Sequence, residues 1–328
     1  MKKTNFLYAS AIMMAFAFGV TSCEQSIDNP VDSVNRGATL SDLIDEYAQN
    51  GVLELPSGLD VELTETLVLD APLTITSKGA PATIIAKAGF VTNSSIVFSN
   101  VNIDATNAGA PLVKMNTLPI DGLNDKGAFE VEKITFDGVT IDGLSNQLFY
   151  ANKQKYLINS LEINNSTINI AGGSSKTIID FNGGGFPLNV TISKSTIEAD
   201  ATSSWSNGGF FSTQSGAKIT DVTSVEGATH IFTVIDSKLT GIAKGKTLCT
   251  LRENNKDYQY YVVKDNVVAD CGKSGQFLKG FCGGQNINKK DNWTASGNVV
   301  TFDGVDKGAE ENNCLEGACL VPETAEEE

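Results

Sequence analysis

Four oxygen-bearing side chains recur at one position of a repeated sequence pattern. Asp104, Asp142, Asn169 and Glu198 each follow an apolar residue by six positions, inside runs such as "ITFDGVTID" and "LEINNSTIN". If the repeats stack as parallel strands, these side chains lie ~4.8 Å apart on one outer face. Carboxylates that close favour a bridging cation, and oxygen ligands suit Ca²⁺. The alternative is a solvated face on which the side chains spread apart and bind no ion.

A second group of residues has the chemistry of sugar binding, because aromatic rings stack on sugars while amide and charged groups bond their hydroxyls. The group comprises Tyr150, Asn152, Lys155, Tyr156, Asp180 and Asn182. It lies between two long loops, roughly residues 114–131 and 212–230, at the same place in the repeat. Such loops project from one edge and leave a floor ~10–14 Å wide. Alternatively, these are ordinary turn residues, and Trp205 is a weaker aromatic candidate nearby.

Both groups depend on a pattern that occurs seven times, with two apolar anchors five residues apart in each copy. Five of the seven copies have Gly, Asn or Asp two positions after the first anchor, as a bend with a left-handed backbone requires. Lys194 and Lys264 are the exceptions. A third apolar run follows each bend. The anchor pairs are Phe98/Ile103, Phe136/Ile141, Ile163/Ile168, Ile192/Ile197, Val234/Leu239, Val262/Val267 and Ala295/Val300.

Three short strands per copy, with no helix between them, predict an all-β fold: a single-stranded parallel β-helix of about seven or eight coils over residues 38–305. An antiparallel sandwich is the alternative, but it would not keep the same bend in register seven times. Leu40, Leu43, Ile44 and Tyr47 have helical spacing. They predict an N-terminal helix that caps the first coil.

With this pattern, residues 38–305 resemble the right-handed β-helices of the pectin-lyase-like superfamily, and more narrowly the uncharacterised β-helical lipoproteins of Bacteroidetes-type bacteria. The resemblance implies a right-handed coil. It also implies that the acidic row could serve a calcium-dependent lyase, with Lys238 beside Glu198 as the candidate base. The hydrolase motifs of the superfamily are mostly missing: only Asn102-Ile103-Asp104 matches, and the sole histidine, His230, does not lie between glycines.

The N-terminus predicts export and lipidation. An apolar stretch too short to span a membrane follows Lys2 and Lys3 and ends at Val20-Thr21-Ser22-Cys23. Residues 1–22 resemble a lipoprotein signal peptide, with Cys23 as the lipidated residue; cleavage without lipidation is the alternative. Residues 23–37 are expected to form a flexible tether, and residues 306–328 an acidic tail. We expect an outer-membrane lipoprotein at the cell surface, held to the membrane by its lipid only.

The other cysteines and the net charge indicate which covalent links, cofactors and partners to expect. In an exported chain, Cys314 with Cys319 and Cys271 with Cys282 are candidate disulfide pairs, and Cys249 has the pattern of a buried strand residue. A formal net charge of −15 makes nucleic acid a poor partner. No nucleotide-binding or zinc motif occurs. We expect no cofactor, apart from Ca²⁺ if the acidic row binds it.

These observations favour a non-catalytic surface lipoprotein that binds or presents a polysaccharide or glycoconjugate. The shortage of catalytic bases argues against an enzyme. Two alternatives remain: a polysaccharide lyase or hydrolase that uses the acidic row, and a structural or adhesive protein that recognises a partner through its long side.

Overall fold

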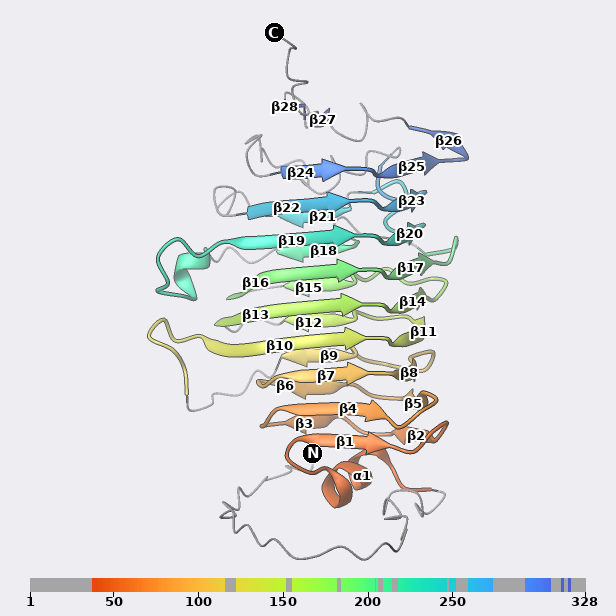
Figure 1. Cartoon of the computed structure of the whole chain (residues 1–328), viewed down its shortest axis with the longest axis vertical. Helices are drawn as coiled ribbons and strands as arrows, with labels where there is room; N and C mark the ends of the chain where they lie inside the picture. The colour runs from red at the N-terminus through yellow and green to blue at the C-terminus, as the bar shows by residue number, and fades with distance from the viewer. Residues whose placement is uncertain are drawn as a thin grey trace, which may run out of the picture.

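The chain folds as a right-handed parallel β-helix, which confirms the predicted fold class. The coils stack along one axis, from β1 at the bottom of Figure 1 to β25 near the top. The computed structural model describes residues 37–115, 122–151, 155–181, 184–203, 205, 209–213, 218–246, 248–251, 259–273, 293–307, 314–315 and 318–319. Within these residues, no helix is long and apolar enough to cross a membrane.

Three sheets form the walls of the helix, and each of the first seven coils adds one strand to each wall in turn. The first sheet has nine parallel strands, so the described chain makes nine rungs there instead of the seven or eight predicted. In stacking order they are β1 (Val52–Leu55), β4 (Leu73–Ser77), β7 (Ile96–Ser99), β10 (Phe129–Asp137), β13 (Lys155–Asn164), β16 (Gly184–Ser193), β19 (His230–Ile235), β22 (Gln259–Lys264) and β24 (Trp293–Ser296).

The second sheet adjoins the first across the bend. Its nine parallel strands end in one antiparallel strand, β26 (Val305–Asp306). The parallel strands are β2 (Asp60–Leu63), β5 (Ala82–Ala86), β8 (Val101–Asp104), β11 (Thr140–Leu144), β14 (Thr167–Ile170), β17 (Thr196–Ala199), β20 (Lys238–Thr240), β23 (Val267–Ala269) and β25 (Val299–Phe302).

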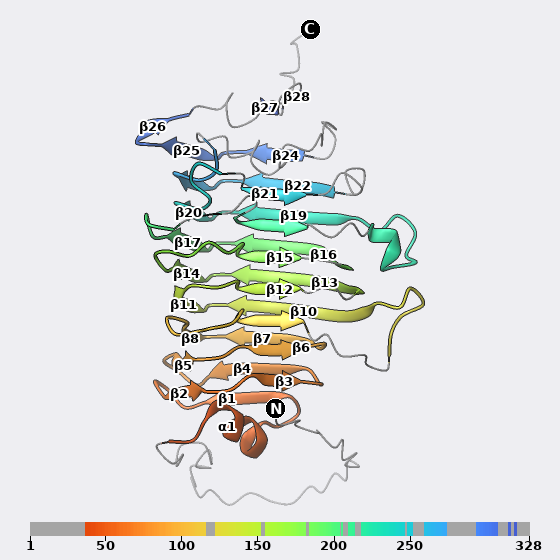
Figure 2. The same ribbon diagram turned by 180° about the vertical axis from the view of Figure 1, so that it is seen from behind.

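The third sheet lies behind the first in Figure 1 and is seen from its own side in Figure 2. It has seven strands: β3 (Leu67–Leu69), β6 (Phe90–Thr92), β9 (Val113–Met115), β12 (Phe149–Ala151), β15 (Ile179–Phe181), β18 (Phe211–Thr213) and β21 (Cys249–Leu251). A separate antiparallel pair follows the coils, β27 (Cys314–Leu315) and β28 (Ala318–Cys319).

The rungs share one register over most of the stack. Phe136 of β10 aligns directly with Phe98 of β7, so no extra rung lies in the long segment between those two anchors. The sixth predicted anchor pair is wrong by one residue. Val263 and Val268 point inward, whereas Val262 is partly exposed and Val267 is 53% exposed. The sequence could not resolve this slip, because four consecutive residues, Tyr260 to Val263, are all apolar or aromatic.

A left-handed backbone marks every bend between the first and second sheets. The φ angle there is 51° at Asn100, 62° at Gly138 and 49° at Asn165. Because of the one-residue slip, the sixth bend is at Asp265, with a φ of 56°, and not at Lys264. Lys194, with a φ of 48°, is therefore the one bend among these seven that is not Gly, Asn or Asp. A lysine there is strained relative to those residues.

A buried polar ladder follows these bends. The side chain of Ser195 accepts a hydrogen bond from the Ser166 backbone N–H at 3.1 Å, and that of Ser237 accepts one from the Ser195 N–H at 3.2 Å. Asn266 and Asn298 continue the ladder in the next two coils. Each side chain thus satisfies a backbone donor of the coil before it, which a buried polar group needs.

The core is a continuous apolar column with stacked aromatic rings. Phe98 and Phe136 stack with ring centroids 5.2 Å apart, and Phe211 lies 5.0 Å from Phe232. Full burial of such side chains stabilises the fold by about 1.5–3 kcal/mol each. Trp205 belongs to this column and is 5% exposed, so its ring does not offer a surface platform.

The predicted helix, α1 (Leu40–Tyr47), packs against β1 and β2 and covers the N-terminal end of the column (Figure 1). Thr39 and Asp42 form a capping box, and Leu40, Leu43 and Ile44 are buried. The predicted signal peptide, including Cys23, and all but the last residue of the predicted tether lie outside the described residues.

We predict that Ile168→Asp abolishes soluble, folded protein. Ile168 is fully buried and aligned with Ile141 and Ile197, so the substitution places an unpaired charge in the column at a cost of several kcal/mol. Thr167→Asp is the matched control, since Thr167 is the partly exposed neighbour on the same strand. Thermal denaturation followed by circular dichroism tests both; equal melting of the two variants would contradict the register.

We predict that Lys194→Asn raises the free energy of unfolding by ~0.5–1 kcal/mol, because asparagine tolerates the left-handed backbone better than lysine. Lys264→Asn is the control. It replaces a strand residue with a poorer strand former and should be neutral or slightly destabilising. Urea denaturation of both variants measures this difference. Stabilisation by Lys264→Asn instead would place the sixth bend where the sequence pattern puts it.

Candidate binding site at the loop-bearing edge

The predicted acidic row exists on the outer face of the second sheet, and two of its carboxylates, Asp142 and Glu198, have side-chain partners. Asp104 aligns with Asp142, and Asn169 donates a hydrogen bond to Asp142 at 2.6 Å. Glu198 pairs with Lys238 at 2.5 Å, and both side chains are well exposed. A bulge after Ile141 also breaks the register of the row. Lys238 therefore has a carboxylate partner, and its role as a base stays a prediction.

The described residues contain no group of three or more His, Cys, Asp or Glu side chains that could hold a metal ion. Towards the C-terminal end, Ala269 and Thr301 continue the row after Thr240, because Val268 points inward. The members of the row after Glu198 are therefore Thr240, Ala269 and Thr301, and none of them is a carboxylate. Calcium binding by Asp104, Asp142, Asn169 and Glu198 stays a prediction, and the side-chain arrangement adds no support to it.

His230 is fully buried at the start of β19. Its ring stacks on Phe211 with centroids 5.6 Å apart, and its Nδ1 lies 2.7 Å from the Pro187 carbonyl oxygen. Burial lowers the pKa of the imidazole to about 4, and the bond to Pro187 acts in the opposite direction. This neutral imidazole is enclosed within the coil and does not reach the surface.

The described residues include four of the six cysteines. Cys249 and Cys271 are buried, and burial raises the pKa of the Cys271 thiol to about 12. Cys282 lies outside the described residues, so its pairing with Cys271 stays a prediction. The backbone of Cys314 lies opposite that of Cys319 across the β27–β28 ribbon. That placement is compatible with the predicted disulfide between them.

Two of the predicted glycan-binding residues come together on the third sheet. Tyr150 of β12 aligns with Asp180 of β15, and both are partly exposed. Burial raises the pKa of the Asp180 carboxyl, while a hydrogen bond with Gln147 and the nearby charge of Lys176 act in the opposite direction. Tyr150 and Asp180 therefore form a small polar patch on the third sheet.

The other predicted residues do not join this patch as surface contacts. Tyr156 is fully buried and packs on Gly185, where an added Cβ would lie 1.8 Å from its ring. Burial, reinforced by Tyr150 and Asp180, raises the pKa of its hydroxyl. Lys155 is exposed and directs its ammonium to the Lys126 carbonyl oxygen, 3.5 Å away. Asn152 and Asn182 lie outside the described residues.

The two long loops project from the same edge, as predicted, at the left of Figure 1 and the right of Figure 2. However, they do not leave an open floor between them. The second loop contains the short helix η2 (Ile219–Asp221) and folds back over β13 and β16. Its Ile219 and Val222 bury Leu157 and Phe186 in a second apolar cluster. The part of the predicted floor formed by Leu157 and Phe186 is thus covered, because these side chains are apolar and the loop removes them from water.

Hydrogen bonds join the two loops across 98 residues of sequence. The Asn124 amide donates to the Val222 carbonyl oxygen at 2.8 Å and also to Glu130 at 2.9 Å. The Ser224 hydroxyl donates to Asp125. The Asn124 side-chain oxygen accepts bonds from the backbone N–H groups of Lys126 and Ala128, so it also fixes the turn of its own loop. The first loop is therefore held firmly beneath the second.

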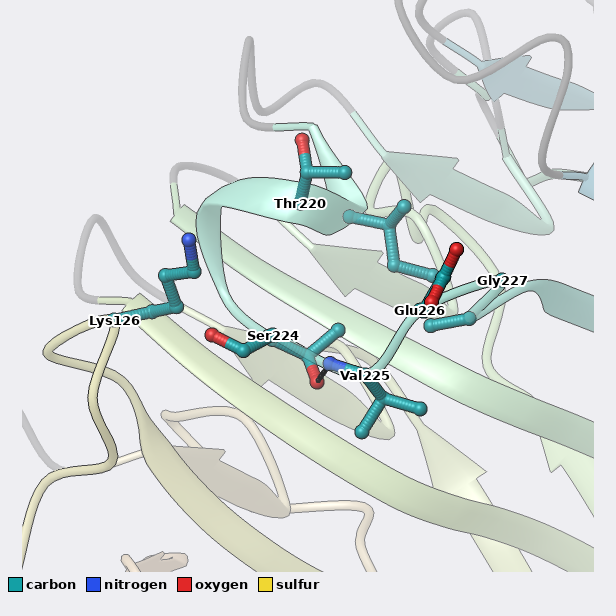
Figure 3. Close-up of a pocket in the computed structure, with 9 residues that line it drawn as sticks. Lys126, Thr220, Ser224, Val225, Glu226 and Gly227 are labelled. Carbon is teal, nitrogen blue, oxygen red and sulfur yellow. Dashed lines mark hydrogen bonds between the residues drawn. The ribbon is translucent and has the colours of Figure 1, made fainter.

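A solvent-open hollow of about 370 Å³ remains where the loops meet. Figure 3 shows Lys126 on one side, Ser224 in the middle and Glu226 on the other side. Thr223 also lines it and accepts a hydrogen bond from the Val225 N–H at 3.1 Å. The complete lining is Lys126, Ile219, Thr220, Thr223, Ser224, Val225, Glu226, Gly227 and Ala228. The wall thus combines hydroxyls, one ammonium, one carboxylate and small apolar groups.

These lining residues were missed individually by the sequence analysis, although it singled out both loops by their length. Lys126 comes from the first loop and the others from the second, so no contiguous motif contains them. The run "TDVTSVEG" in the second loop is rich in hydroxyl and acidic groups and was the only local signal. Their convergence depends on the fold of the second loop over β13 and β16.

Residues 61–200 match the model of a family described as a domain of unknown function, DUF4957. The match begins in β2, in the first coil, and ends directly after β17. It includes Lys126, Tyr150 and Asp180, whereas the second loop lies beyond it. No curated protein and no solved structure matches the chain significantly.

We predict that the free energy of unfolding rises with pH between about 4 and about 6.5, partly because of His230. The unfolded state binds a proton below ~6.5 and the folded state only below about 4. At ~1.4 kcal/mol per pKa unit, this difference in pKa changes the free energy of unfolding by about 3 kcal/mol across the range. Urea denaturation across this range should show a smaller pH dependence for His230→Asn, which retains a donor for Pro187.

The chain has one histidine, so NMR titration of the wild-type imidazole gives an independent check that needs no variant. Its resonance should stay at the neutral position above pH 5. A midpoint near the ordinary value of ~6.5 would show that the ring is accessible to solvent.

Proposed function

We propose that the protein is a cell-surface lipoprotein whose β-helix binds glycan without cleaving it, at the hollow where the two loops meet. The observation that carries the proposal is the convergence of Lys126 with Thr220, Ser224 and Glu226, from loops far apart in sequence. Sugars are recognised by hydroxyl, ammonium and carboxylate groups set in a shallow site beside apolar surface. Anchoring through Cys23 at the outer membrane is part of this proposal.

The absence of an assembled catalytic set supports a binding role. Among the described residues, Lys238 is paired with Glu198, His230 is enclosed, and the hollow contains a single carboxylate. Glycoside hydrolysis generally uses two carboxyl groups across the scissile bond. The proposal also places the chain near the β-helical lipoproteins of the pectin-lyase-like superfamily, an assignment supported by the fold and not by any named relative.

The polar patch of Tyr150 and Asp180 on the third sheet is a secondary contact area in this proposal. Tyr150 is partly exposed, and Asp180 lies beside it in register. An aromatic ring beside a carboxyl group can stack on a sugar while bonding its hydroxyl.

We predict that the mature protein is retarded in affinity electrophoresis by at least one member of a panel of plant and host polysaccharides. The shift should be unaffected by EDTA, and no new chain ends should appear. Thr220→Ala should weaken the retarding interaction about 2- to 10-fold, as expected for one lost hydrogen bond. Thr191→Ala is the matched control, because Thr191 lies on the outer face of β16 and not in the hollow.

Three results would contradict the proposal. No retardation by any polysaccharide would favour the structural or adhesive alternative. Unsaturated ends that absorb in the ultraviolet would establish a lyase. Equal weakening by Thr220→Ala and Thr191→Ala would move the binding site away from the hollow.

A further inference from the structure

The hollow contains two opposite charges that have no ion-pair partner within the described part of the chain. The ion pairs there join Lys87 to Glu62, Lys238 to Glu198, and Lys244 to Asp270 and Asp303; Lys126 and Glu226 take part in none of them. An ammonium and a carboxylate without partners, on opposite sides of one hollow, favour a ligand that carries a complementary charge.

Three acidic side chains of the two loops have hydrogen-bond donors of their own. Asp125 accepts the hydroxyl of Ser224, and Glu130 accepts the amide of Asn124. Asp221 accepts the backbone N–H of Lys218 at 2.8 Å. These three carboxylates thus have donors of their own, and none of them forms an ion pair with Lys126.

The backbone of Lys126 is held in place by hydrogen bonds. Its backbone N–H donates to the Asn124 side chain at 3.0 Å, and its carbonyl oxygen accepts the ammonium of Lys155 at 3.5 Å. Asn124 in turn bonds Val222 of the second loop. The backbone of Lys126 is therefore held beside the second loop, and its exposed side chain extends from that fixed point.

We propose that this hollow binds a carboxylated sugar, with the ligand carboxylate at Lys126 and its hydroxyl groups at Thr220 and Glu226. The inference rests on the proposed glycan-binding function and specifies its ligand. The volume of about 370 Å³ is at the small end for ligand pockets, so it suits one or two sugar rings. A net charge of −15 repels long polyanions, which favours a short saccharide with an isolated carboxylate.

Two matched pairs of short saccharides test the proposal by isothermal titration calorimetry with the mature protein. The first pair is 3′-sialyllactose and lactose, and the second is digalacturonic acid and its dimethyl ester. The acidic member of at least one pair should bind 10-fold tighter or more than its neutral counterpart. The preferred pair identifies the source of the carboxylate as a sialic acid or a uronic acid.

Lys126→Gln should reduce the affinity for the acidic saccharide to that for the neutral one, about a 10-fold loss. Lys133→Gln is the control, because Lys133 is also exposed and its replacement changes the net charge equally, but it lies outside the hollow. The preference of the wild type should fall as the salt concentration rises.

The inference fails if acidic and neutral members of both pairs bind alike, or not at all, or if Lys126→Gln leaves the preference unchanged. Each of these results can occur while a neutral polysaccharide still retards the protein through Thr220, which would leave the glycan-binding function intact. Loss of all retardation in the polysaccharide panel is a separate result and would overturn the function itself.

Discussion

Hydrogen bonding between successive coils is the constraint on which the rest of this structure depends. In a parallel β-helix, the backbone groups of each strand find their partners in the coils before and after it, so each coil must keep the register of its neighbours. Phe98, Phe136, Ile163, Ile192 and Val234 consequently form one inward column, although they are far apart in sequence. Extra residues can be accommodated only where the chain leaves a wall.

The bend between the first and second sheets reinforces this register from within. A left-handed residue turns the chain, and the residue after it is Ser166, Ser195, Ser237, Asn266 or Asn298 in the later coils. Each of these side chains accepts a backbone N–H of the preceding coil. A coil that slipped by one residue would leave those buried donors unpaired and would move an apolar column to the surface.

The same constraint explains where function can reside. The walls are fully occupied by stacking, and on the second sheet Asn169 and Lys238 bond the carboxylates of Asp142 and Glu198. Two connections from the third sheet back to the first carry extra residues, and these are the loops that meet. They bury apolar side chains of β13 and β16 beneath Ile219 and Val222, and they leave Lys126 and Glu226 at the surface above.

The sequence alone determined the coiled architecture, the capping helix, the bends and the common edge of the loops, because each follows from local spacing repeated many times. It went wrong at Val262 and Val267, where a continuous apolar run hides the inward phase. It also could not place Tyr156, whose burial depends on Gly185 in the next coil. Only the tertiary structure decided that the loops close over the floor and bring Lys126 to Ser224 and Glu226. That outcome depends on contacts between irregular segments 98 residues apart, and irregular segments carry no repeating pattern from which such contacts could be read.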